Sequence, residues 1–166
     1  MYSAPTSQRL ARFLFTSFLL EYLWIVEKGT KMKTVYVGMA LTEAPLEFRD
    51  DFQIELKSAL RELTDVVVLD FVGLENGGAV EVYRHDRRCT ELADLCVFIT
   101  DCASTGMGME IWIRRTTQKR MLLFAKLNQK VTRMLIGFAE DEGIPFIRYA
   151  NVSDIVAVIK AELEKM

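Results

Sequence analysis

The chain of 166 residues has only one histidine and three cysteines. A single histidine, His85, argues against a histidine-based metal site and against a Ser-His-Asp triad. The cysteines, Cys89, Cys96 and Cys102, lack the spacing of a metal site. Their odd number, with one of them inside an apolar strand, indicates reduced thiols and a cytoplasmic protein. We therefore expect no metal ion.

Excess positive charge is also missing, since the formal net charge is −2. This excludes the electrostatic footprint of a nucleic-acid-binding protein. The pairs Arg87-Arg88 and Arg114-Arg115 are too short for a polybasic patch, and we expect them on solvated helix faces.

No run is long enough to span a bilayer, which takes about 20 apolar residues. The longest apolar stretch, residues 13–26, is broken by Glu21, and no small-residue cleavage site follows it. Residues 1–31 are left with three interpretations: an amphipathic helix, an interface element, or a non-native upstream extension. We expect the domain proper to cover residues 32–166, with 1–31 as an N-terminal helical or non-native extension.

Apolar segments alternate with segments of helical periodicity along the rest of the chain. Near-continuous apolar runs are typical of strands that are buried on both faces. Strands are expected at 34–37, 66–71, 95–99, 121–125 and 145–149, and helices at 45–63, 79–93, 106–118, 128–142 and 153–165. The pattern predicts an α/β protein, a five-stranded parallel sheet with helices on both faces in a flavodoxin-like or Rossmann-like three-layer arrangement. Ligands of such folds bind beyond the carboxyl ends of the strands, at the switch in strand order.

The stretch from Ile99 to Ile111 is the most informative one. An apolar strand runs into a small polar loop, two glycines follow, and Glu110 stands among apolar neighbours. Gly106 and Gly108 allow backbone to approach a ligand, and a helix start suits anions. We expect Glu110 at the N-terminal end of the helix, where it stays ionised. The alternative is an ordinary strand-to-helix turn, because no complete dinucleotide or P-loop motif is present.

A second carboxylate, Asp86, lies 24 residues earlier on the preceding predicted helix. Paired carboxylates near a binding crevice suit glycosidic-bond chemistry, in which one acid attacks the anomeric carbon and the other protonates the leaving group. The alternative is a solvated acid beside Arg87 and Arg88.

These motifs together carry a family resemblance. Tyr36 ends the first strand, Asp86 lies on the helix before the third strand, Ala93-Asp94 precede that strand, and residues 104–110 read Ser-Thr-Gly-Met-Gly-Met-Glu. From Thr34 to the C-terminus the chain resembles the nucleoside 2-deoxyribosyltransferase superfamily, which includes 2′-deoxynucleoside 5′-monophosphate N-glycosidases.

The resemblance implies roles for individual residues. Glu110 would attack C1′ of a 2-deoxyribosyl group, Asp86 would handle the proton of the departing base, and Tyr36 would orient the nucleophile or the sugar. Gly38 and the turn with Ser104, Gly106 and Gly108 would bind substrate, with Ser104 favouring a nucleotide. Thr132 matches a serine that reaches the phosphate from a neighbouring subunit, which implies a homodimer. No cofactor is implied.

The loop after the first strand departs from that pattern. The arginine that binds phosphate in the hydrolases is missing from it, Arg49 is the first one available, and Glu43 would repel a phosphate. Two other functions stay open: a non-catalytic nucleotide-binding or sensing module of the same fold, and a structural domain whose acids are only surface charges.

Overall fold

The computed structural model describes residues 32–42, 44–69 and 78–166. The predictions for the segment 1–31, for Glu43 and for the end of the second strand lie outside these residues.

Five parallel strands form one sheet, as the sequence predicts. They are β1 (Lys33–Met39), β2 (Val66–Leu69), β3 (Leu95–Ile99), β4 (Met121–Lys126) and β5 (Phe146–Tyr149), in the spatial order β2-β1-β3-β4-β5. The chain leaves β1 towards β2 and returns to β3 on the other side. The switch in strand order therefore lies between the carboxyl ends of β1 and β3, where a parallel α/β sheet binds its ligands.

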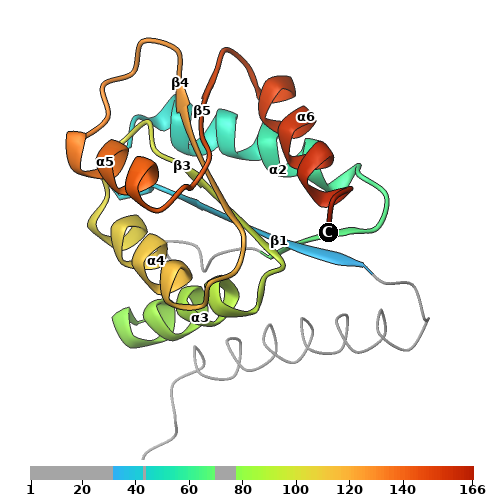
Figure 1. Cartoon of the computed structure of the whole chain (residues 1–166), viewed down its shortest axis with the longest axis horizontal. Helices are drawn as coiled ribbons and strands as arrows, with labels where there is room; N and C mark the ends of the chain where they lie inside the picture. The colour runs from blue at the N-terminus through green and yellow to red at the C-terminus, as the bar shows by residue number, and fades with distance from the viewer. Residues whose placement is uncertain (1–31, 43, 70–77) are drawn as a thin grey trace, which may run out of the picture.

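Helices cover both faces of the sheet (Figure 1). The helix α2 (Gln53–Arg61) and the helix α6 (Val152–Leu163) pack on the face formed by Val35, Val37 and their neighbours. The opposite face, formed by Tyr36, Phe98 and their neighbours, is covered by α3 (Ala79–Leu92), α4 (Thr105–Thr116) and α5 (Arg133–Asp141). The predicted three-layer fold is confirmed.

Two predicted helices differ from the observed ones. The segment expected as one helix over 45–63 opens with the π-helix η1 (Glu47–Phe52) before α2 begins. The wider turn stacks Phe48 on Phe52, with ring centroids 5.2 Å apart, and Phe52 in turn stacks on Tyr149. The helix expected from residue 128 begins only at Arg133, because Asn128 has a φ of 69° and Thr132 caps the helix.

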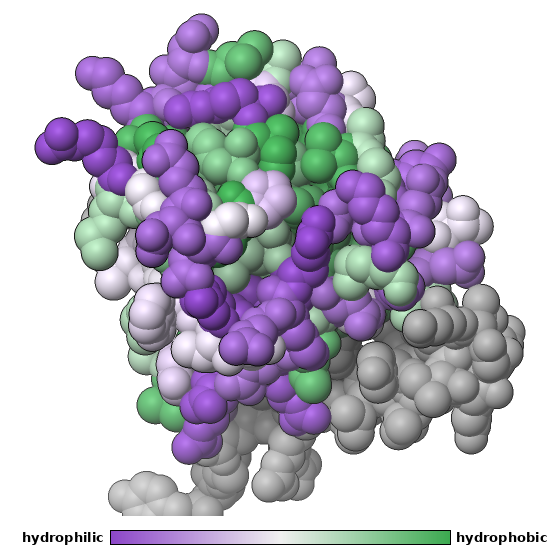
Figure 2. All heavy atoms as spheres, viewed as in Figure 1, coloured by the Kyte–Doolittle hydropathy of each residue, from purple (hydrophilic) through white to green (hydrophobic). Residues whose placement is uncertain are grey.

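The surface on the side drawn in Figure 2 is mostly hydrophilic, with one apolar area in its upper half, where Figure 1 draws β5 with α5 and α6 on either side. Within the described residues, no helix combines the length and the hydropathy that a membrane crossing requires.

Candidate active site

Two neighbouring strands form the floor of the site. Tyr36 and Gly38 lie two residues apart on β1, so both face α3 and α4. Their register partners on β3 are Cys96 and Phe98. Tyr36 is 1% exposed and Phe98 is fully buried, so this floor is dry and apolar apart from the tyrosine hydroxyl.

Glu110 reaches this floor from α4. The helix is anchored by Met107 and Ile111, which are buried on either side of the glutamate. Its Oε2 atom is shielded from solvent and has no hydrogen-bond partner among the described residues. A Cβ added to Gly38 would lie 2.7 Å from this oxygen and 2.6 Å from the ring of Phe98. The carboxyl group therefore occupies space that exists only because residue 38 is glycine.

Three titratable side chains meet at this point. The pKa of Glu110 is raised to about 8, mainly by burial and secondly by the charge of Asp86, while a hydrogen bond from Tyr36 acts in the opposite direction. The pKa of Tyr36 is raised by its own burial and then by the charges of Glu110 and Asp86. The structure thus brings together Tyr36, Asp86 and Glu110, from β1, α3 and α4. Both carboxylates are half-buried, which contradicts the interpretation of these acids as mere surface charges.

The expected ionisation of Glu110 at a helix N-terminus is wrong. The helix α4 begins at Thr105, so Glu110 is its sixth residue, and the first turn contains no acid. The dipole effect fades within the first turn, whereas burial beside a second carboxylate favours the protonated form. The sequence shows the glutamate and the glycines but not where the helix starts.

Asp86 is held by the buried end of α3. Cys89 and Thr90, one turn further along, are buried against the sheet and α4. The Asp86 Oδ1 atom is shielded from solvent, while the adjacent Arg87 is exposed and pairs with Glu91 at 2.8 Å. Asp86 is therefore not a solvated side chain that pairs with Arg87.

The turn that was predicted to bind substrate, with Ser104, Gly106 and Gly108, forms the N-terminus of α4. Ser104 caps α4, with its hydroxyl oxygen accepting a hydrogen bond from the Met107 N–H at 3.3 Å. Gly106 and Gly108 are exposed in the first turn, and a Cβ on Gly108 would meet nothing within 4 Å. Internal packing does not require glycine at position 108, so a requirement there would come from a ligand.

Thr132 lies apart from the three clustered side chains. It is exposed at the N-terminus of α5, where its hydroxyl oxygen accepts from the Met134 N–H at 3.4 Å. No contact between Thr132 and the carboxylates occurs in the described part of the chain. Arg49, the first arginine available after the loop that follows β1, pairs with Asp50 at 2.9 Å.

Sequence reasoning missed two residues around the site. Phe98 faces Gly38 and the Glu110 carboxyl, a neighbourhood that only the register of β1 and β3 creates. Arg114 was expected on a solvated helix face but is 0% exposed. The only signal for it was its position four residues after Glu110, on the same side of the helix.

No site for a metal ion was identified among the residues that the structure describes, since none of their His, Cys, Asp and Glu side chains form a suitable group of three or more.

The comparisons with known proteins bear on the fold of the chain. No family model and no curated protein matches the sequence. Among solved structures, the CMP N-glycosidase BcmB of Clostridium botulinum superposes with a TM-score of 0.60 and 15% identity, over 78% of this chain and 99% of that one. The chain thus shares the fold of BcmB.

Two further solved structures are also similar to the chain. The molybdenum cofactor binding protein of the phototrophic bacterium Rippkaea orientalis superposes with a TM-score of 0.51 and 11% identity, over 80% of this chain and 98% of that one. A 2-desoxiribosyltransferase from Leishmania mexicana gives a TM-score of 0.45 and 21% identity, over 56% and 64%. Related architectures therefore include an enzyme and a cofactor-binding protein, and the site has to decide between them.

Proposed function

We propose that the protein cleaves or transfers at the N-glycosidic bond of 2′-deoxynucleosides or their 5′-monophosphates. The observation that carries this proposal is the Glu110 Oε2 atom, which is buried, lacks a hydrogen-bond partner among the described residues, and lies over Gly38 beside Asp86 and Tyr36. Burial without hydrogen-bond partners destabilises an ionised carboxylate, so a carboxyl group in such a place is either protonated or functional.

Retaining glycosidase chemistry needs one carboxylate as the nucleophile and one protonated carboxyl group as the acid. In the ligand-free site, burial and the charge of Asp86 hold the pKa of Glu110 at about 8, so Glu110 keeps a proton at neutral pH. The proposed reaction therefore requires this proton to pass to Asp86 before Glu110 attacks. The hydrogen bond from Tyr36 lowers the pKa of Glu110 and so favours its carboxylate form.

The reaction then proceeds in two displacements. A Glu110 oxygen forms a bond to C1′ while the C1′–N bond breaks, and its electron pair leaves with the base as Asp86 supplies a proton. Water, or a second base, next attacks C1′ and returns a proton to Asp86 while Glu110 departs as the carboxylate. Two inversions at C1′ give net retention.

The surroundings of the pair support the substrate class that we propose. The site lies where β1 and β3 end, and the exposed first turn of α4 presents Gly106 and Gly108 next to it. Backbone N–H groups at such a turn suit a phosphate or a sugar hydroxyl. The name of BcmB, a CMP N-glycosidase, supports a pyrimidine nucleotide as one member of the test panel.

We further infer a homodimer in a reducing, cytoplasmic environment. Met109 and Trp112 are 51% and 63% exposed on α4, and Met134 is 85% exposed on α5, next to Thr132. Large apolar side chains on helices around a site mark an interaction surface. A partner docked there would bring its own Thr132 towards the site, as the resemblance implies. The three cysteines are free.

The test is release of free base. The purified protein is incubated with deoxynucleosides and their 5′-monophosphates, with and without an acceptor base, beside Glu110→Ala and the matched control Glu140→Ala on the exposed surface of α5. Base release by the wild type and the control, but not by Glu110→Ala, is expected. If no substrate yields base while nucleotides still bind, the protein is instead a nucleotide-binding module.

A further inference from the structure

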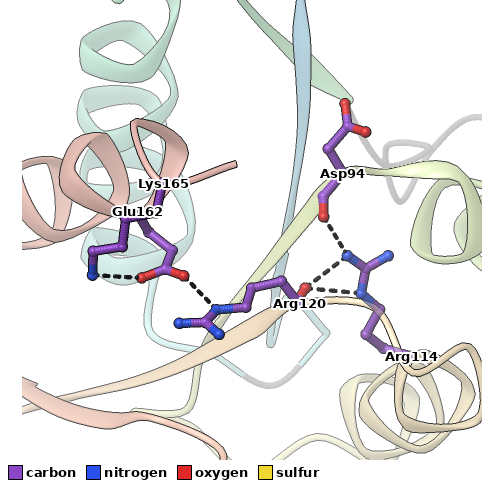
Figure 3. Close-up of polar contacts among 5 residues, drawn as sticks. All are labelled: Asp94, Arg114, Arg120, Glu162 and Lys165. Atoms are coloured by element: carbon purple, nitrogen blue, oxygen red, sulfur yellow. Dashed lines mark hydrogen bonds and ion pairs between the residues drawn. The ribbon is translucent and has the colours of Figure 1, made fainter.

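Arg114 is a fully buried arginine on α4, one helical turn beyond Glu110. Among the described residues, its guanidinium donates to backbone carbonyl oxygens only. The Nε and Nη2 atoms bond to the carbonyl oxygen of Arg120 at 3.0 and 2.6 Å, and Nη2 also bonds to that of Asp94 at 2.8 Å (Figure 3). The Nη1 atom bonds to the carbonyl oxygens of Thr90 at 3.0 Å and Ala93 at 2.8 Å.

These contacts join the two helices that carry the carboxylates. Thr90 lies four residues after Asp86 on α3, just as Arg114 lies four residues after Glu110 on α4. Residues four apart on a helix lie on the same face. The bond between Arg114 and Thr90 therefore links α3 to α4 one turn away from each carboxylate, and it faces the same inter-helix space.

The rest of the contacts fix this link to the sheet. Asp94, which begins the turn into β3, accepts hydrogen bonds through its side chain from the N–H and the hydroxyl of Thr34 on β1. Arg120 precedes β4, and its side chain pairs with Glu162 of α6 (Figure 3). Arg114 thus holds the ends of α3 and α4 against β3 and β4. The contacts of Asp94 with β1 and of Arg120 with α6 fix the starts of these two strands in turn.

Packing alone would not require an arginine here. Removing a guanidinium from water is unfavourable, and burial lowers the pKa of Arg114 although the charges of Cys96 and Asp94 act in the opposite direction. Apolar side chains hold two helices together without that penalty. What the guanidinium adds is a rigid planar fork whose donors set the positions of several carbonyl oxygens at once.

We propose that Arg114 is a positioning residue, which sets the separation of Asp86 and Glu110 by clamping α3 to α4 one turn below them. The proposal rests on the proposed function for its catalytic consequence only, since the geometry of the pair can be measured without any substrate.

The test compares Arg114→Met and Arg114→Lys with Arg115→Met. The lysine variant keeps the charge and up to three donors, so it is the milder change. Arg115 is the next residue on the same helix and is partly exposed, where it pairs with Glu142 at the end of α5. It therefore controls for the loss of an arginine from α4 without loosening the clamp.

The first readout is the pH titration of Glu110, monitored by NMR of its carboxyl carbon in the ligand-free protein. The ionisable groups that act on this carboxyl from the described elements are Asp86 of α3, Tyr36 of β1 and Cys96 of β3. Loosening the clamp separates the carboxylates and admits water, so the Glu110 midpoint should fall by about one pH unit or more in both Arg114 variants. In Arg115→Met it should stay at the wild-type value.

The second readout is steady-state kinetics on whichever substrate the base-release assay identifies. A small displacement of reacting groups lowers the rate by on the order of 100-fold, so kcat should fall while KM changes less, with Arg114→Lys between wild type and Arg114→Met. A merely structural role would lower the unfolding temperature and leave the Glu110 midpoint unchanged.

Different results would overturn the positioning role of Arg114 and the proposed glycosidic activity. An unchanged Glu110 midpoint in a folded Arg114→Lys protein overturns the positioning role, whether or not base is released. A lowered midpoint without base release from any substrate supports the positioning role and removes the proposed activity.

Discussion

Glycine at position 38 shows how a single missing side chain creates the site. The space above it holds the Glu110 carboxyl and the edge of the Phe98 ring. Gly38→Ala should therefore displace Glu110, abolish base release and lower the free energy of unfolding by about 1–3 kcal/mol, as overpacking does. Chemical denaturation and the base-release assay measure the two effects.

Gly137→Ala is the matched control for this change. A Cβ there meets nothing within 4 Å on α5, so alanine should stabilise the helix by about 1 kcal/mol and leave activity intact. Equal activity of the two alanine variants would contradict the crowding argument at position 38.

The raised pKa of Glu110 makes a prediction about stability and pH. Its folded-state value of about 8 lies above the ordinary value of 4.5, so between these limits the folded protein keeps a proton that the unfolded chain has lost. The free energy of unfolding then falls as pH rises through this window, by up to about 1.4 kcal/mol per pH unit. Glu110→Gln removes this term.

The stability of Glu110→Gln relative to wild type should accordingly increase from pH 4.5 to 8 and then level off. Urea unfolding at a series of pH values measures it, with Glu140→Gln as the exposed control. A pH-independent difference between Glu110→Gln and wild type would mean that the carboxyl is not held in its neutral form.

At the scale of elements, the two ends of α4 differ in their packing. Its first turn is open and capped by Ser104, whereas its middle and end are packed against α3 through Glu110 and Arg114. The glycines of the open turn lower helix stability without any packing need for them.

Gly108→Ala separates a role in folding from a role in binding. Alanine meets no atom there, so the unfolding temperature should rise, with a gain of up to about 1 kcal/mol. If the turn approaches substrate closely, KM should rise about 10-fold or more in the same variant. A more stable protein with unchanged KM would remove the turn from the binding site.

At the scale of the whole molecule, the exposed apolar side chains of α4 predict self-association. If the protein forms the proposed homodimer, Trp112→Arg should convert it to a monomer and raise KM, since the Thr132 that we propose the neighbouring subunit supplies would be lost from the site. Ile54→Arg on α2, at the same 63% exposure on the other side of the sheet, should leave the dimer intact. Light scattering after size exclusion measures both, and a monomeric wild type would overturn the prediction.

The sequence by itself determined the five strands, their parallel arrangement and the order of the helices, because apolar periodicity is a local property of the chain. It also pointed to Tyr36, Asp86 and Glu110, since their motif spacing can be seen without coordinates. Element ends were less secure, as the π-helix η1 and the late start of α5 show.

Only the tertiary structure decided the protonation of Glu110 and the burial of Arg114. Desolvation depends on neighbours from β1, β3 and α3 that are far away in sequence, so the same glutamate can be ionised on a surface or neutral above Gly38. The pair Arg114-Arg115 looks uniform in the sequence, yet one member is clamped in the interior and the other pairs at the surface. Which of two adjacent arginines faces inwards is set by the packing of α3 against α4.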